Sequence, residues 1–220
     1  MGKEQVNLTI QCIRRLPYYL QFLRDAQEQG TEYISATTIA AGLELNDVVV
    51  RKDISSVCAT AGKPKVGFAV KELITGIEEC LGYHNLSDAV LVGAGSLGHA
   101  LLANQEFEKN GLNIVTAFDI DPSVVGKTLG GKKILHLSKL KELCGKMHIH
   151  IGIITTPAQC AQEICDMLVE VGVKAIWNFA LVKLSVPEDV LVQNENLAAS
   201  LAVLSRHLKE QMTKQQREGH

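Results

Sequence analysis

The chain has 220 residues, of which 46% are hydrophobic and 21% charged, and its formal net charge is −2. This length suits two small domains or one larger one, and the composition is typical of a soluble globular protein. Because the chain as a whole is not basic, a nucleic-acid role would have to rest on a local basic patch. No run approaches the roughly 18 apolar residues of a membrane span, and the N-terminus has no apolar signal core. We therefore expect a cytoplasmic protein that does not bind a membrane.

The six cysteines are scattered, and none forms a C-x-x-C pair. Such cysteines in an intracellular chain are mostly buried free thiols, so a structural zinc site is not expected. His148 and His150 stand two positions apart on a predicted strand, but they have no obvious third ligand. The sequence therefore predicts no metal site.

Residues 1–82 are predicted to form a small helical domain. Apolar residues at helical spacing predict helices over 8–29, 37–41, 47–57 and 71–82. Pro17 is irregular inside the first helix, and an alternative is that it marks the helix start. Asn46 is a typical N-cap for the third helix, and residues 61–68 have the composition of a β-wing.

A short helix, a glycine-containing turn and a second helix form the outline of a helix-turn-helix, whose second helix enters a major groove. On the helix 47–57, an apolar face of Val50, Ile54 and Val57 leaves a basic face elsewhere. The alternative is a plain helical domain with a solvated basic face, and three short helices alone favour that alternative. The residues predicted to contact DNA are Arg14, Arg15, Val49, Arg51, Lys52, Ser55, Lys63 and Lys65.

Residues 85–194 begin with a dinucleotide-binding fingerprint. The apolar run 89–92 leads into Gly-Ala-Gly-Ser-Leu-Gly at 93–98, a helix is predicted over 99–109, and the next strand, 113–118, ends on Asp119. This order is the full G-x-G-x-x-G pattern. Gly95 would let the backbone approach a pyrophosphate, and Asp119 would bind a ribose 2′-hydroxyl and disfavour NADP. The nearest rival is the related coenzyme A-binding fold.

Further strands over 133–135, 148–154 and 173–177 alternate with helices over 138–144 and 157–171. This alternation predicts an α/β fold with a doubly wound parallel sheet and right-handed crossovers. Ligands bind at the carboxyl ends of such strands. The predicted ligand is NAD(H), and its predicted binding residues are Gly93, Ala94, Gly95, Ser96, Leu97, Gly98, Asp119, Asp121, Thr156, Pro157, Asn178 and Phe179.

Residues 195–220 are predicted to form a C-terminal helix, over about 196–213, followed by a polar tail. Leu197, Leu201, Leu204 and Leu208 give the helix an apolar stripe. A terminal amphipathic helix needs a partner surface. It either packs on its own domains or exchanges with a second chain.

Over residues 10–208 the chain resembles the Rex family of redox-sensing transcriptional repressors. The matching stretches, in this order, are Arg-Leu-Pro-Tyr-Tyr at 15–19, Val-Arg-Lys-Asp at 50–53, Val-Gly-Ala-Gly-Ser-Leu-Gly at 92–98, Ala-Phe-Asp-Ile-Asp-Pro at 117–122, Thr-Pro-Ala at 156–158 and Asn-Phe-Ala at 178–180. The resemblance implies a homodimer with swapped C-terminal helices. Its winged-helix domains would bind a palindromic operator, and a high NADH/NAD⁺ ratio would release the DNA without turnover of the cofactor.

The chain departs from the family pattern at several positions. Asn104 stands where the family has an aromatic Tyr, and Asn196 stands where it has an acid that pairs with the arginine of Arg-Leu-Pro. We therefore expect Arg15 to lack its usual charged partner and the NADH response to be blunted. Val49 replaces a polar residue of the recognition helix, and the wing differs from the family's, with a one-residue insertion near Pro64.

Two other readings stay open at this stage. A relative that binds a nucleotide or coenzyme A without DNA would share the glycine motif. An NAD-dependent oxidoreductase would need an acid–base group near the nicotinamide, and the strand-end loops offer only Thr155, Thr156 and Asn178. The sequence therefore argues against an enzyme.

Overall fold

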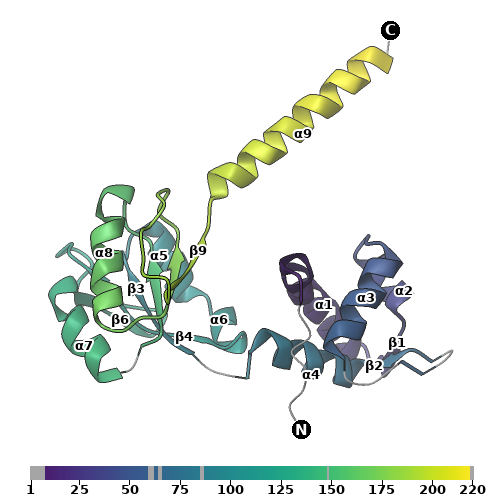
Figure 1. The fold of residues 1–220 in the computed structure, drawn as a ribbon, viewed down its shortest axis with the longest axis horizontal. Coiled ribbons are helices and arrows are strands. Elements are labelled where there is room, and N and C mark those ends of the chain that lie inside the picture. The colour runs from purple at the N-terminus through teal and green to yellow at the C-terminus, as the bar shows by residue number, and fades with distance from the viewer. Residues whose placement is uncertain (1–7, 59–61, 64–65, 85–86, 148, 219–220) are drawn as a thin grey trace. The chain divides into compact units, whose positions relative to one another are not determined.

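A computed structural model describes residues 8–58, 62–63, 66–84, 87–147 and 149–218. The chain divides into two compact units, Met1–Asn85 and Leu86–His220. Figure 1 shows both units and labels most of their helices and strands.

The N-terminal unit contains α1 (Ile10–Glu28), β1 (Tyr33–Ile34), α2 (Ala36–Gly42), α3 (Asp47–Val57), β2 (Phe68–Ala69) and α4 (Val70–Leu81). Its core joins one face of α1 to α2, α3 and α4, with Leu16, Leu23, Ile39 and Ile54 fully buried. Apolar residues at helical spacing therefore predicted the buried faces correctly. The alternative start at Pro17 is wrong, because Pro17 lies inside α1. The ring is exposed, so water can reach the carbonyl that lacks an amide donor.

The helix-turn-helix outline is present in α2 and α3. Ser35 caps α2, and the Asn46 side chain accepts hydrogen bonds from the backbone N–H groups of Val48 and Val49 at the start of α3. In the described part of the wing, Lys63 and Gly67 form an antiparallel bridge, and β2 then pairs with β1. This agrees with the winged-helix prediction. Lys65 and Pro64 lie outside the described residues.

The second unit is built on a seven-stranded sheet with the order β5-β6-β4-β3-β7-β8-β9. Its strands are β3 (Ser87–Val92), β4 (Leu112–Asp119), β5 (Thr128–Leu129), β6 (Lys132–His136), β7 (Ile151–Ile154), β8 (Ala175–Asn178) and β9 (Leu191–Asn194). All neighbouring pairs are parallel except β5 with β6. The order of the six parallel strands is that of the Rossmann fold, and its switch point lies between β3 and β7.

Helices cover both faces of this sheet. The remaining elements are α5 (Ser96–Ala103), α6 (Glu106–Lys109), the 3₁₀ turn η1 (Leu137–Lys139), α7 (Leu140–Met147), α8 (Ala158–Glu170) and α9 (Leu197–Glu218). One core joins the sheet to α7 and α8, and the other joins it to α5 and α6. The prediction of a doubly wound sheet is therefore confirmed.

Three local expectations need correction. The helix predicted over 99–109 is two helices: α5 ends at Ala103, and the side chain of the following Asn104 accepts a hydrogen bond from the backbone N–H of Glu106. The sequence also predicts Ser138 as the cap of the helix over 138–144, but the cap is His136, whose ring accepts a hydrogen bond from the Ser138 N–H. The short strands β5 and β9 were not predicted.

The C-terminal helix α9 is longer than expected, and every described side chain from 198 to 213 is exposed. The exposed apolar ones include Leu201, Val203, Leu204, Leu208 and Met212. Asn196 begins the helix by accepting a hydrogen bond from the Ala199 N–H. Within the described residues, no helix is long and apolar enough to cross a membrane.

Candidate nucleotide pocket and nucleic-acid interface

The glycine loop that follows β3 has the backbone geometry its sequence demands. Gly93 has φ +104°, a conformation that L side chains rarely adopt. A Cβ on Gly98 would collide with the carbonyl oxygen of Gly93, so this glycine lets α5 pack closely against the loop. A Cβ on Gly95 would meet open space. The neighbours of Gly93 and Gly98 therefore leave no room for a side chain, whereas the space beside Gly95 is open.

The loop meets the end of β7 at the switch point of the sheet. The Thr155 N–H donates to the Val92 carbonyl at 2.9 Å. The Thr155 hydroxyl donates to the Gly93 carbonyl at 2.6 Å. These bonds hold the carboxyl ends of β3 and β7 together, which is where ligands bind in open α/β sheets.

Asp119 ties the end of β4 to the same loop. One carboxylate oxygen accepts a hydrogen bond from the Ala94 N–H at 2.6 Å. The other accepts from the N–H groups of Ile120 and Asp121, at 2.7 and 2.9 Å. A carboxylate has about four lone-pair sites, so it can still accept one further bond, from a sugar hydroxyl.

A pocket of about 720 Å³ opens at this point. Its lining includes five of the residues predicted from the sequence: Gly93, Gly95, Asp119, Thr156 and Pro157. Its size lies within the range of small-molecule sites. The pocket therefore brings the glycine loop, the acid after β4 and the loop after β7 to one place.

Two features of this pocket suit a ligand that carries hydroxyl and phosphate groups. The Thr156 hydroxyl is buried and has no hydrogen-bond partner within the described part of the chain, so it is free to bind a ligand. The eight-residue helix α5 begins directly after Gly95, and the N–H groups and dipole of a helix N-terminus favour a phosphate. Ser96 and Leu97 form its exposed first turn.

Three other predicted residues are placed elsewhere. Asn178 is fully buried; its amide donates to Val182 and Asn194 and accepts from the Ala180 N–H. This side chain therefore fixes the loop after β8. Asp121 accepts from the Ser123 N–H in the turn after β4. Phe179 packs against Trp177, with ring centroids 4.8 Å apart.

Sequence reasoning missed one wall of the pocket. Beyond the predicted loops, the lining includes Ile120, Leu137, Cys160, Glu163 and Ile164. The last three are at i, i+3 and i+4 on α8, and they share one side of the helix because 3.6 residues make a turn. The helical spacing of these residues after Pro157 could have indicated this wall, but the sequence prediction considered only the loops at the ends of strands.

The exposed face of α3 carries the side chains predicted to contact DNA. Arg51, Lys52 and Ser55 are exposed, and Val49 is 37% exposed. Arg51 makes a weak surface pair with Asp47 at 3.5 Å, and such exposed pairs contribute little stability. Arg14 is also exposed, on α1, and the Lys63 ammonium lies 5.6 Å from the centre of the Tyr33 ring.

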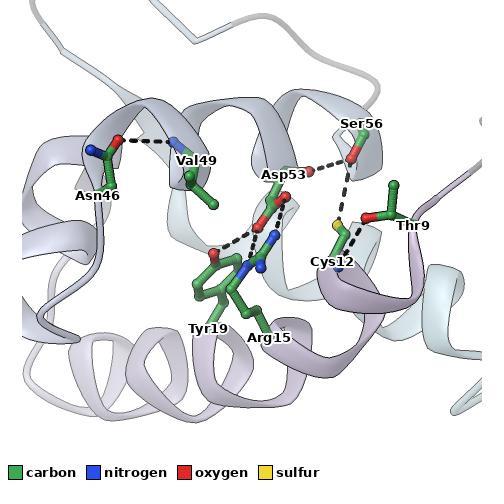
Figure 2. Close-up of polar contacts among 8 residues, drawn as sticks. All are labelled: Thr9, Cys12, Arg15, Tyr19, Asn46, Val49, Asp53 and Ser56. Atoms are coloured by element: carbon green, nitrogen blue, oxygen red, sulfur yellow. Dashed lines mark hydrogen bonds and ion pairs between the residues drawn. The ribbon is translucent and has the colours of Figure 1, made fainter.

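Arg15 is placed differently from the other predicted DNA contacts. Its guanidinium donates two hydrogen bonds to the Asp53 carboxylate, at 2.7 and 3.0 Å, and the Tyr19 hydroxyl donates a third at 2.8 Å (Figure 2). Arg15 therefore has a carboxylate partner within its own unit. Two stretches that carried the family resemblance, Arg-Leu-Pro and Arg-Lys-Asp, meet in this ion pair.

The burial of this cluster shifts its proton equilibria. Burial alone raises the pKa of Asp53, but the hydrogen bonds from Arg15 and Tyr19 outweigh it and hold that pKa below its usual value. Burial and the neighbouring Asp53 carboxylate raise the pKa of Tyr19 to about 12. The cluster is thus a charged arginine–aspartate pair with a neutral tyrosine at neutral pH.

Comparisons with known proteins cover both units. The family model "CoA binding domain" matches residues 84–182, and "Putative DNA-binding protein N-terminus" matches residues 9–55. The redox-sensing transcriptional repressor Rex of Treponema denticola is 42% identical over 204 residues, which are 93% of this chain and 96% of that protein. Rex of Bacteroides fragilis is 39% identical over 206 residues, 94% and 93% of the two chains.

Solved structures agree over the full length. The crystal structure of RSP in complex with β-NAD⁺ and operator DNA superposes with a TM-score of 0.86 at 30% identity, over 97% of this chain and 98% of that one. RSP in complex with β-NADH gives a TM-score of 0.83 at 30% identity, over 96% and 98%. RSP is described as a Rex-family repressor.

Proposed function

The chain belongs to the Rex family of redox-sensing transcriptional repressors, and from this we propose that it binds operator DNA and senses the NADH/NAD⁺ ratio. The observation that carries the proposal is that one relative, solved with both β-NAD⁺ and operator DNA, matches 97% of this chain. The match to this relative therefore includes both the N-terminal unit and the unit that contains the nucleotide pocket. Since the family consists of repressors, we infer that the dinucleotide acts as a signal and is not turned over.

The residues that would hold NAD(H) are those around the strand-end pocket. Gly93 and Gly98 shape the loop, Gly95 leaves room for the pyrophosphate, and Asp119 would accept hydrogen bonds from the adenosine ribose. The unpartnered Thr156 hydroxyl offers a further polar contact. A 2′-phosphate beside Asp119 would be repelled, which favours NAD(H) over NADP(H).

A Gly95→Asp variant tests this assignment. An added side chain at Gly95 extends into open space, so the fold is preserved while the carboxylate repels the pyrophosphate. NADH binding by calorimetry should weaken at least tenfold relative to wild type. Equal binding by both proteins would place the dinucleotide elsewhere.

The exposed side chains of α3 and the wing are proposed to bind the operator. Arg51, Lys52 and Lys63 supply positive charge, and each phosphate contact releases counterions, so binding should weaken steeply with salt. A gel shift with operator duplex, titrated with NADH at fixed NAD⁺, tests repression and redox response together. We expect release less sharp than in a relative that carries the tyrosine and the acid at positions 104 and 196. Failure to bind any duplex at low salt without NADH would overturn the repressor assignment.

We also propose that α9 forms the interface of a homodimer. Its exposed apolar side chains, including Leu201, Leu204 and Leu208, need a partner surface, and a second copy of the chain supplies one. Removing the residues after Gln193 should give monomers or insoluble protein by light scattering. A soluble dimer of the shortened chain would contradict this proposal.

The match to the coenzyme A-binding model favours one rival ligand for the same pocket. Coenzyme A carries a phosphate on its adenosine ribose, and that phosphate would face the Asp119 carboxylate. NADH should therefore outcompete coenzyme A. Tighter binding of coenzyme A in a competition titration would favour the rival.

A further inference from the structure

The pocket is lined by groups of different chemistry. They include the glycine loop and Asp119, and also the apolar Ile120 and Leu137 and residues from the first turns of α8. Ile120 directly follows Asp119 and is 64% exposed. An apolar side chain left exposed beside a sugar-binding carboxylate provides a wall against which a base attached to that sugar can pack. This reasoning rests on the proposed dinucleotide binding.

Helix α8 contributes one charged group to this lining. On α8, Ala161 and Cys165 are fully buried, while Glu163 is exposed and lines the pocket. In the described part of the chain, its carboxylate makes no hydrogen bond or ion pair. Asp119 is the other carboxylate of the lining, and it is already committed to three backbone N–H groups.

The acids that lie farther along α8 have partners away from the pocket. The Asp166 side chain accepts a hydrogen bond from Gln162 at 2.8 Å, and Glu170 pairs with Lys141. Glu163 therefore differs from its neighbours on the helix both in facing the pocket and in having an unused carboxylate. An ionised carboxylate only accepts hydrogen bonds, so its ligand must present a donor.

We propose that Glu163 is a specificity-determining residue of this pocket, and that it selects a dinucleotide whose purine base carries an amino group at C6. Adenine presents such a donor at C6. Hypoxanthine and guanine present a carbonyl oxygen at C6, which would face the carboxylate acceptor to acceptor. Sites that hydrogen-bond a ligand N–H reject analogues that lack it, because the polar group of the site is left unpaired.

Calorimetric titration of the full-length protein with NADH and with its deamino analogue, reduced nicotinamide hypoxanthine dinucleotide, tests this proposal. The wild-type protein should bind NADH about fivefold more tightly, a modest ratio because Glu163 is exposed to water. In Glu163→Gln the ratio should fall towards one, because an amide both donates and accepts. In Glu163→Lys it should reverse, because an ammonium donates to the carbonyl.

Glu170→Gln is the matched control, since it removes a carboxylate from the same helix outside the pocket. It should keep the wild-type ratio. An unchanged ratio in both Glu163 variants would overturn the role of Glu163. If Gly95→Asp still abolished NADH binding in that case, the proposed function would stand. Absence of NADH binding by the wild-type protein would overturn both.

Discussion

The strand-end pocket and the exposed face of α3 present a ligand with different kinds of group. In the pocket, the proposed phosphate contacts come from backbone: the glycine loop and the N–H groups of the first turn of α5. On α3, the groups available to DNA are the side chains of Arg51, Lys52 and Ser55. Backbone groups bind a ligand only in one particular chain conformation, whereas the side chains on α3 need only a helix that stays in place. Ligand binding in the pocket should thus be sensitive to substitutions that change the backbone, and DNA binding to substitutions that destabilise the packing of α3.

The support beneath α3 is expected to show the largest effect. Asp53→Ala would leave the partly buried Arg15 charge and the buried Tyr19 hydroxyl without their acceptor, and should lower the free energy of unfolding of the N-terminal unit by about 3 kcal/mol. Hydrogen exchange in peptides from residues 10–57 measures this loss. Arg51→Ala, which breaks an exposed pair, should cost less than about 0.5 kcal/mol. Similar losses in the two variants would show that the Asp53 cluster does not support α3.

The same cluster predicts a pH dependence. The pKa of Asp53 is lower in the folded protein than in the unfolded chain. Its contribution to stability is therefore present above about pH 4 and is lost as the pH falls through the folded-state pKa. Urea unfolding as a function of pH should show a smaller acid-dependent loss in Asp53→Asn than in wild type. Parallel curves for the two proteins would contradict the assignment.

At the start of the nucleotide pocket, substitution of Gly95 and of Gly98 should have different effects. Gly98→Ala places a Cβ against the Gly93 carbonyl oxygen and should lower the free energy of unfolding of the second unit by about 2 kcal/mol. Gly95→Ala fills open space at negative φ, so its stability should remain within about 0.5 kcal/mol of wild type, while NADH binding weakens. Urea unfolding and calorimetry separate the two outcomes. Equal stability of the two variants would refute the packing argument.

A single contact on the DNA face should have the smallest effect. Lys52→Ala should weaken operator binding by about 1–2 kcal/mol if it contacts a base, and it should reduce discrimination at one operator position. A phosphate contact would weaken binding to all sequences alike and lower the salt slope by about one. Lys139→Ala, which removes an exposed lysine from the second unit, is the control. Gel shifts of Lys52→Ala that match those of Lys139→Ala would remove Lys52 from the interface.

The contrast between the two sites also explains what the sequence predicts well. The strand, glycine loop, helix and acid around Gly93 and Asp119 are contiguous in sequence, so local pattern was enough to place them. The two-residue strand β5 and the edge strand β9, with only Val192 partly buried, carry no alternation from which a strand could be predicted. The end of α5 before Asn104 was not predicted, because in the sequence Asn104 looks like any other polar residue of a helix.

Residue roles were harder to predict than positions. Asn178 was expected to bind the cofactor because it ends a strand. Its side-chain amide instead makes hydrogen bonds with the loop after β8 and with Asn194. Arg15 was expected to lack the family's usual charged partner, which is replaced by Asn196, and the sequence prediction did not foresee its pair with Asp53, 38 positions away. Both outcomes depend on side-chain hydrogen bonds that helical or strand periodicity does not encode. Cys160, Glu163 and Ile164 were missed because they line the pocket from a helix.

Trp177 is the chain's only tryptophan, and it lies in the second unit. Phe107 meets it edge-on with centroids 5.6 Å apart, and its indole N–H donates to Glu195 just after β9. Intrinsic tryptophan emission therefore reports on this unit alone, while the N-terminal unit has only tyrosine and phenylalanine as fluorophores. Reduced nicotinamide absorbs in the band where tryptophan emits, so NADH bound to the same unit would quench that emission by energy transfer. Tryptophan fluorescence should therefore measure how much of the protein has NADH bound, without an added label.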